Sequence, residues 1–203
     1  MILLKILIVK IIFAAIMTFA GSLWIDKLYS RCTDLTFPEE ISSRSRFRRP
    51  MIFFSFSCFN LVVGDLWIIA AIFLLILMTM TDFEQYMLFD EMTSSLALLG
   101  IFYVWQTNLS FQDHAMATLI GGGVFLLLAI ISKGSLGGGD VKLVAALGLW
   151  LGSEKLLSVV LIGTIIGGIA AMFMILAKKK DRKSYFAYGP YFSLTAIYFL
   201  LSR

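Results

Sequence analysis

The chain has 203 residues, of which 60% are hydrophobic and 15% are charged, and its mean hydropathy is +0.91. Globular domains carry about a quarter charged residues, so this composition excludes a water-soluble domain. The formal net charge is +4, but the basic residues stand in short clusters between apolar runs. That pattern is typical of membrane-protein loops rather than of a nucleic-acid surface. The sequence therefore predicts an all-α polytopic membrane protein without a nucleic-acid partner.

Apolar runs follow one another along the chain, and several reach the length of about 17–25 residues that a helix needs to cross a bilayer. We expect about eight transmembrane helices, near residues 4–24, 51–63, 66–81, 92–106, 115–132, 140–151, 156–177 and 186–202. The segment 51–63 is short, so it crosses fully only with tilt or local thinning of the bilayer. If it does not cross, the orientation of every later helix is reversed.

The first helix has some features of a signal peptide. Lys5 and Lys10 precede an apolar stretch, and small residues stand near its end at Ala20, Gly21 and Ser22. Cleavage there would remove one membrane crossing and disturb the distribution of loop charges. We therefore expect this segment to be a retained first helix.

The loops between the eight expected helices differ strongly in charge. One set of loops holds twelve basic residues, and the opposite set holds only Lys155. The basic set consists of residues 25–49, 82–91, 133–140 and 178–185, and the opposite set of residues 64–65, 107–114 and 152–155. Basic loops remain in the cytoplasm, so the sequence predicts that Asp82 and Asp140 both emerge on the cytoplasmic side.

Two aspartates stand at the ends of apolar helices on that side. Asp82 follows the run 66–81, and Asp140 follows three glycines at 137–139. An ionisable group at such a place is costly and usually marks chemistry or transport. Two carboxylates held close together share one proton, which suits an aspartic protease, and glycines leave room for a substrate backbone. The simpler alternative makes Asp140 a helix N-cap and Asp82 an ordinary polar residue at a helix end.

Three motifs occur in the same order and spacing as in a known family. The first is Asp82 with Asp90 eight residues later, the second is Gly137-Gly138-Gly139-Asp140-Val141-Lys142-Leu143, and the third is the run 186–190, which ends in Gly189-Pro190. Together they resemble the type IV prepilin peptidases, which are membrane aspartic proteases of the GxGD type. The resemblance extends over about residues 50–200.

The resemblance implies that Asp82 and Asp140 form the catalytic pair of a single integral-membrane peptidase domain over residues 1–203. It implies a bacterial inner-membrane enzyme that removes the basic leader of type IV prepilins or pseudopilins at the cytoplasmic face, surrounded by membrane lipid. Other residues that shape the site would be Asp90, Gly137, Gly138, Gly139, Lys142, Gly189 and Pro190.

The chain departs from the family pattern at two places. Phe89 stands where the family usually has proline before the second aspartate. Many members also carry two CxxC pairs, which bind zinc beside a methyl-transfer function, in the first cytoplasmic loop. In this chain the corresponding loop, at 25–49, is short and basic and holds only Cys32. We therefore expect no zinc or other metal and no cofactor for proteolysis, with S-adenosyl-methionine required only if N-methylation of the new terminus is retained.

Two alternatives remain open from the sequence. A presenilin-like intramembrane protease also uses a GxGD aspartate, but typically has a tyrosine before its first aspartate, where this chain has Thr81. A small transporter or membrane assembly subunit would instead use Asp82 and Asp140 to couple ions. That protein would show no proteolysis.

Overall fold

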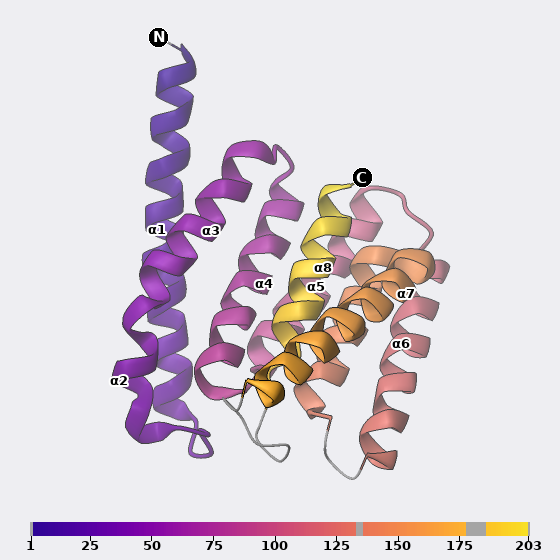
Figure 1. Ribbon diagram of the computed structural model, residues 1–203. Helices are drawn as coiled ribbons and strands as arrows, with labels where there is room; N and C mark the ends of the chain where they lie inside the picture. Colours follow the sequence, from indigo (N-terminus) through magenta and orange to yellow (C-terminus); the bar gives the residue numbers. More distant parts are fainter. Residues whose placement is uncertain (1, 133–135, 178–185, 203) are drawn as a thin grey trace. The chain divides into compact units, whose positions relative to one another are not determined.

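The computed structural model describes residues 2–132, 136–177 and 186–202, and within these ranges it contains helices and turns but no strand. The chain divides into two compact units, residues 1–87 and 88–203, which are described separately below (Figure 1). The expected all-α membrane fold is confirmed, because four helices are long and apolar enough to span a bilayer. Residues 133–135 and 178–185, which belong to two of the predicted cytoplasmic loops, lie outside the described ranges.

The first unit is built from three long helices and three short helical turns. In chain order they are α1 (Ile2–Arg31), η1 (Pro38–Glu40), α2 (Ile41–Arg44), η2 (Ser45–Phe47), α3 (Arg48–Val62) and α4 (Leu66–Gln85). The expected loop 25–49 is thus wrong in detail, since α1 continues to Arg31 and short helices fill much of the remainder. In its most apolar window α4 is 72% buried, whereas α1 is 11% buried. The helix that carries Asp82 is therefore enclosed, and α1 leaves an apolar surface for lipid.

Lys10 lies within the apolar part of α1, and its contacts explain how a charge is accommodated there. Its ammonium donates to the carbonyl oxygens of Asn60 at 2.7 Å and Leu61 at 3.2 Å, in the last turn of α3. In return, Nδ2 of Asn60 donates to the Lys10 carbonyl at 2.9 Å. A cation at a helix C-terminus satisfies the free carbonyl groups and opposes the helix dipole. Lys10 therefore fastens α1 to α3.

Among the described residues of the second unit there are four helical elements. They are α5 (Asp90–Gln106), α6 (Phe111–Ile131), α7 (Gly138–Leu176) and α8 (Gly189–Leu201). The sequence predicted two helices, 140–151 and 156–177, separated by a turn, and α7 consists of two helical segments that meet at a kink. Among its described residues only Gly152 has non-helical angles (φ 71°, ψ −179°). The predicted break is therefore confirmed at Gly152, but it is shorter than the predicted turn over 152–155. Asp113 accepts hydrogen bonds from the N–H of Ser153 at 3.2 Å and from its hydroxyl at 2.6 Å, and the helix resumes at once.

Small residues allow the helices of the second unit to approach one another closely. A Cβ atom added to Gly148 of α7 would lie 2.6 Å from the backbone nitrogen of Thr118 in α6. Gly163 and Gly167, four residues apart on α7, are covered by Phe192 and Tyr188 from the α8 region. Small residues spaced by four are a common contact between helices in membranes. This spacing fixes where α8 packs.

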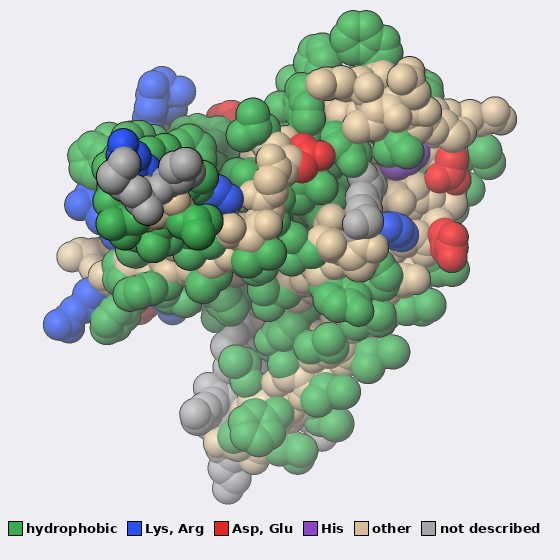
Figure 2. Space-filling model, turned by 90° about the horizontal axis from the view of Figure 1, so that it is seen from above, with side chains coloured by type: hydrophobic (Ala, Val, Ile, Leu, Met, Phe, Trp, Pro, Cys, Tyr) green, Lys and Arg blue, Asp and Glu red, His purple; other side chains and the backbone are tan. Residues whose placement is uncertain are grey.

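Hydrophobic side chains cover most of the surface in the view of Figure 2. Among the most exposed are Leu119 and Ile131 of α6 and Phe173 of α7. So much exposed apolar surface suits contact with lipid tails rather than water. The four helices that meet the length and apolarity of a span are α1, α4, α6 and α7, and α8 is a shorter apolar helix. The count of eight crossings stays a prediction, and so does the orientation derived from loop charge.

Candidate active site

Asp82 lies in the last turn of α4 and is only 5% exposed. The helix ends at Gln85, and Tyr86 closes it in a left-handed conformation (φ 52°) while its N–H donates to the Asp82 carbonyl at 2.9 Å. The expectation of a polar loop over 82–91 is therefore wrong for its first four residues. Two of them, Glu84 and Gln85, have polar partners within the first unit, which stabilise this last turn.

A buried ion pair holds the residue two positions after Asp82. Arg48, the first residue of α3, donates from Nε to Oε1 of Glu84 at 2.8 Å and from Nη2 to Oε2 at 2.6 Å. The Tyr29 hydroxyl donates to the same carboxylate at 2.9 Å, and Nη1 of Arg48 donates to Asp26 at 2.5 Å. Arg48 and Glu84 are 2% and 5% exposed. We refer to Asp26, Tyr29, Arg48 and Glu84 as the Arg48 cluster.

The final residue of α4 is anchored as well. The Gln85 side chain is fully buried; its amide accepts the N–H of Phe37 at 2.8 Å and donates to the Phe37 carbonyl at 3.1 Å. The Arg44 guanidinium lies 3.7 Å from the centre of the Phe37 ring and donates to the carbonyl of Glu84 at 3.3 Å. Carbonyl groups at a helix end otherwise need water or a cap. The segment before α3 therefore completes the helix end that carries Asp82.

Asp140 is the third residue of α7 and is partly buried. The N-cap position is Gly137, whose carbonyl accepts the Asp140 N–H at 3.1 Å, and no side chain caps this helix. The alternative in which Asp140 is the N-cap is therefore wrong. A carboxylate in the first turn is favoured by the helix dipole, so the structure supports an ionisable group here without a capping role.

The three glycines before Asp140 differ in the space around them. A Cβ atom added to Gly138 would have nothing within 4 Å, and one on Gly137 would lie 3.4 Å from Oδ2 of Asp140. A Cβ on Gly139 would lie 2.8 Å from Cβ of Leu88. Among the described glycines positive φ occurs only at Gly152, so close approach, not backbone conformation, explains the glycine at 139.

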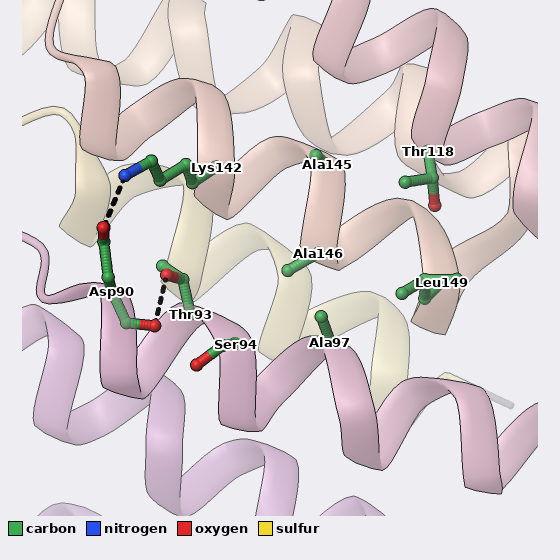
Figure 3. A pocket seen from close by; sticks show the side chains of 9 residues that line it. All are labelled: Asp90, Thr93, Ser94, Ala97, Thr118, Lys142, Ala145, Ala146 and Leu149. Carbon is green, nitrogen blue, oxygen red and sulfur yellow. Dashed lines mark hydrogen bonds and ion pairs between the residues drawn. The ribbon is translucent and has the colours of Figure 1, made fainter.

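Asp90 and Lys142 meet in the second unit at one end of a groove between α5 and α7 (Figure 3). The Lys142 ammonium lies 2.6 Å and 2.7 Å from the two oxygens of Asp90. The groove encloses about 360 Å³, and Ala97, Ala145 and Ala146 lie along it. The structure thus places the family's second aspartate against the residue two positions after Asp140.

Gly189 and Pro190 open α8, where proline suits the first helical turn. The ring of Phe186 stacks on Tyr191 with centroids 5.6 Å apart and an interplanar angle of 6°. Tyr188 packs against Gly167 of α7. The contacts described for this third motif therefore join α8 to α7, and its part in shaping a substrate site stays a prediction.

The residues present do not fit the zinc site of many family members, because four thiolates are required and the stretch 25–49 offers only Cys32. Both Cys32 and Cys58 are free thiols. Over the described ranges, no group of three histidine, cysteine or acidic residues is placed to hold a metal ion.

The sequence did not reveal the role of Arg48 or Glu84. Arg48 belongs to a run of arginines that has the pattern of a cytoplasmic loop, and Glu84 lies within the predicted loop 82–91. One sequence feature could have pointed to them. Arg48 stands two residues before Pro50, which favours the start of a helix, and that helix packs beside α4.

Comparisons with known proteins place the chain among peptidases. The profile of the type IV leader peptidase family matches residues 68–172, a range that includes Asp82, Asp90 and Asp140. A prepilin leader peptidase/N-methyltransferase of Pectobacterium carotovorum is 31% identical over 133 residues, which are 61% of this chain and 47% of that protein. One from Neisseria gonorrhoeae is 34% identical over 122 residues, 57% of this chain and 41% of the relative.

A leader peptide-processing enzyme for type 4 prepilin-like proteins, from Escherichia coli O78:H11, is 32% identical over 138 residues, 64% of this chain and 47% of the relative. The chain spans about half the length of the curated relatives it matches. No solved structure gives a significant match.

The apolar helices define a membrane protein, in which Asp82 and Asp140 lie near helix ends. The family match covers half of the chain. The chain belongs to the type IV leader peptidase family.

Proposed function

We propose that this protein is an aspartic endopeptidase that removes the leader peptide of type IV prepilins or pseudopilins. The observation that carries the proposal is the family match over residues 68–172, which contains both Asp82 and Asp140 at helix ends. The relatives named as prepilin leader peptidases support the substrate class. The enzyme would act in the bacterial inner membrane with its site toward the cytoplasm, as the loop charges predict.

The proposed reaction needs only the two carboxylates and water. One of Asp82 and Asp140 is ionised and takes a proton from water, whose oxygen forms a bond to the scissile carbonyl carbon. The other is protonated and donates its proton to the carbonyl oxygen. The C–N bond then breaks, and the new amine takes a proton from the dyad. No metal or cofactor enters these steps, and S-adenosyl-methionine would serve only a separate methyl transfer.

The test is cleavage of a purified prepilin by the full chain in detergent, followed as the rate per correctly inserted molecule. Asp82→Asn and Asp140→Asn are each expected to lower the rate by a factor of at least about 10³, because each role in the pair needs a carboxyl group. Glu91→Gln is the matched control, since Glu91 is an exposed carboxylate beside Asp90 at the start of α5. Substantial cleavage by either asparagine variant would refute the assignment.

The same assay separates the proposal from an ion-coupling protein. A transporter or assembly subunit would leave the prepilin intact with wild-type protein. A presenilin-like protease would cleave within the substrate's apolar helix rather than between its leader and that helix. Mass spectrometry of the two products decides between these outcomes.

A further inference from the structure

The most highly organised polar feature of the first unit is the Arg48 cluster. The guanidinium of Arg48 forms a two-point contact with Glu84, and its remaining amino group binds Asp26. Charge-assisted, two-point pairs of this kind are stronger and more directional than single hydrogen bonds. Asp26 is half exposed, so of the two ion pairs of Arg48 the one with Glu84 is shielded from water.

A buried ion pair is a costly way to gain stability. Removing two charges from water costs several kcal/mol per ion, and apolar residues of similar volume often serve a fold equally well. The pair does, however, fix geometry, because a planar guanidinium can donate two hydrogen bonds to one carboxylate in only a few orientations. The position of Glu84 in the chain shows what is being fixed.

Glu84 is joined to Asp82 through the last turn of α4. Helix residues two positions apart in the sequence lie about 200° apart around the axis. The Arg48 cluster therefore contacts the side of the turn that is opposite the Asp82 side chain. In addition, the N–H of Tyr86 donates to the Asp82 carbonyl, and the Gln85 side chain forms two hydrogen bonds with the backbone of Phe37. A helix end would otherwise fray; here the turn that carries Asp82 is held from several directions.

We propose that Arg48 and Glu84 are positioning residues for Asp82, which fix the last turn of α4 against α1 and α3 so that the carboxylate is presented in one orientation. This inference rests on the proposed function, because it assigns Asp82 to the reaction. Neither residue is a catalytic residue, since the cluster acts through the backbone of the turn. The contacts to Asp26 and Tyr29 make α1 part of the same support.

The deciding variant replaces both charges together. Arg48→Met/Glu84→Leu removes the directional contact but leaves no buried charge, and such replacements are often neutral for folding. Positioning predicts a folded protein whose kcat falls on the order of 10²-fold, the loss expected from a displacement of about 1 Å, with KM within twofold of wild type. The pH profile of kcat is expected to shift too, because proton sharing depends on where Asp82 lies.

The matched control is Arg49→Gln. Arg49 is the neighbouring arginine in α3, but its guanidinium reaches Ser22 at 3.3 Å and lies over Phe19 instead of contacting α4. This variant is expected to keep wild-type kcat. A folded double variant with kcat within threefold of wild type and an unchanged pH profile would overturn the proposal, as would an equal loss of kcat in Arg49→Gln.

If the double variant does not fold, Glu84→Asp decides the question. It keeps the charge and its partner but shortens the reach by about 1.5 Å, so the turn must move to keep the contact. A fall in kcat of tenfold or more with unchanged KM supports the proposal, and wild-type kcat overturns it. Absence of cleavage by wild type and by Arg49→Gln would instead refute the proposed function itself.

Discussion

Alanine substitutions along the three glycines before Asp140 separate crowding inside the protein from crowding of the substrate. A methyl group at Gly139 would lie 2.8 Å from Cβ of Leu88, about 0.6 Å closer than an ordinary contact of 3.4 Å. The backbone at Gly139 or at Leu88 must then move, because the Leu88 Cβ atom is fixed to its own backbone and cannot rotate away. Overpacking of this kind typically costs about 1–3 kcal/mol.

The shift at Gly139 falls one residue before the proposed catalytic group. Since a displacement of about 1 Å costs on the order of 10² in rate, Gly139→Ala is expected to lower kcat by roughly tenfold. Gly138→Ala has open space around the new methyl group and is the matched control, with wild-type kcat expected. Gly137→Ala makes an ordinary contact of 3.4 Å with Asp140, so any loss there would come from the approaching substrate and would appear in KM.

The assay is prepilin cleavage per inserted molecule over a range of substrate concentrations, with thermal unfolding in detergent measured in parallel. Equal kcat for Gly138→Ala and Gly139→Ala would refute the close approach of Leu88 as a constraint on the site. Gly148→Ala is a poor control, because its methyl group would meet the backbone of Thr118 at 2.6 Å.

Two further predictions concern the kink and the topology. Gly152→Ala is expected to destabilise the protein by about 1–3 kcal/mol or more, because the new methyl group strains a positive φ and overlaps Asp113. Gly168→Ala, which has open space around the new methyl group, is the control and is expected to leave the unfolding temperature unchanged or raised. Equal unfolding temperatures of the two variants would contradict the role of Gly152. In a cysteine-free background, a cysteine at Asn108 is expected to react with an impermeant thiol reagent applied outside the cell and one at Thr33 is not, and the reverse pattern would invert the orientation predicted from loop charge.

Most of the helices could be predicted because the bilayer imposes a length and an apolar composition that are visible in the sequence. The break in α7 could also be predicted, since Gly152 and its polar neighbours have the composition of a turn, but its confinement to Gly152 could not. The contact of Ser153 with Asp113, forty residues earlier in the chain, is what allows the helix to resume. Long-range partners of this kind leave no local pattern.

The same limit applies to the candidate site. Asp82 and Asp140 stand out because isolated carboxylates at the ends of apolar helices are rare. Arg48 and Glu84 do not stand out, because a charged residue next to a membrane helix ordinarily lies in a loop. Both charges can be buried because their mutual contact compensates the free-energy cost of removing them from water.

The proposed function requires that Asp82 and Asp140 form one reactive pair. Replacing both by cysteine in a cysteine-free background and adding a short bifunctional thiol reagent tests it directly, with mass spectrometry of the digested protein as the measurement. Asp90→Cys/Lys142→Cys is the positive control for the reagent, because those side chains already meet at 2.6 Å. We expect efficient cross-linking between positions 82 and 140 within one chain. A folded protein with cysteines at 82 and 140 that does not cross-link, under conditions in which the variant with cysteines at 90 and 142 does, would contradict the proposed pair.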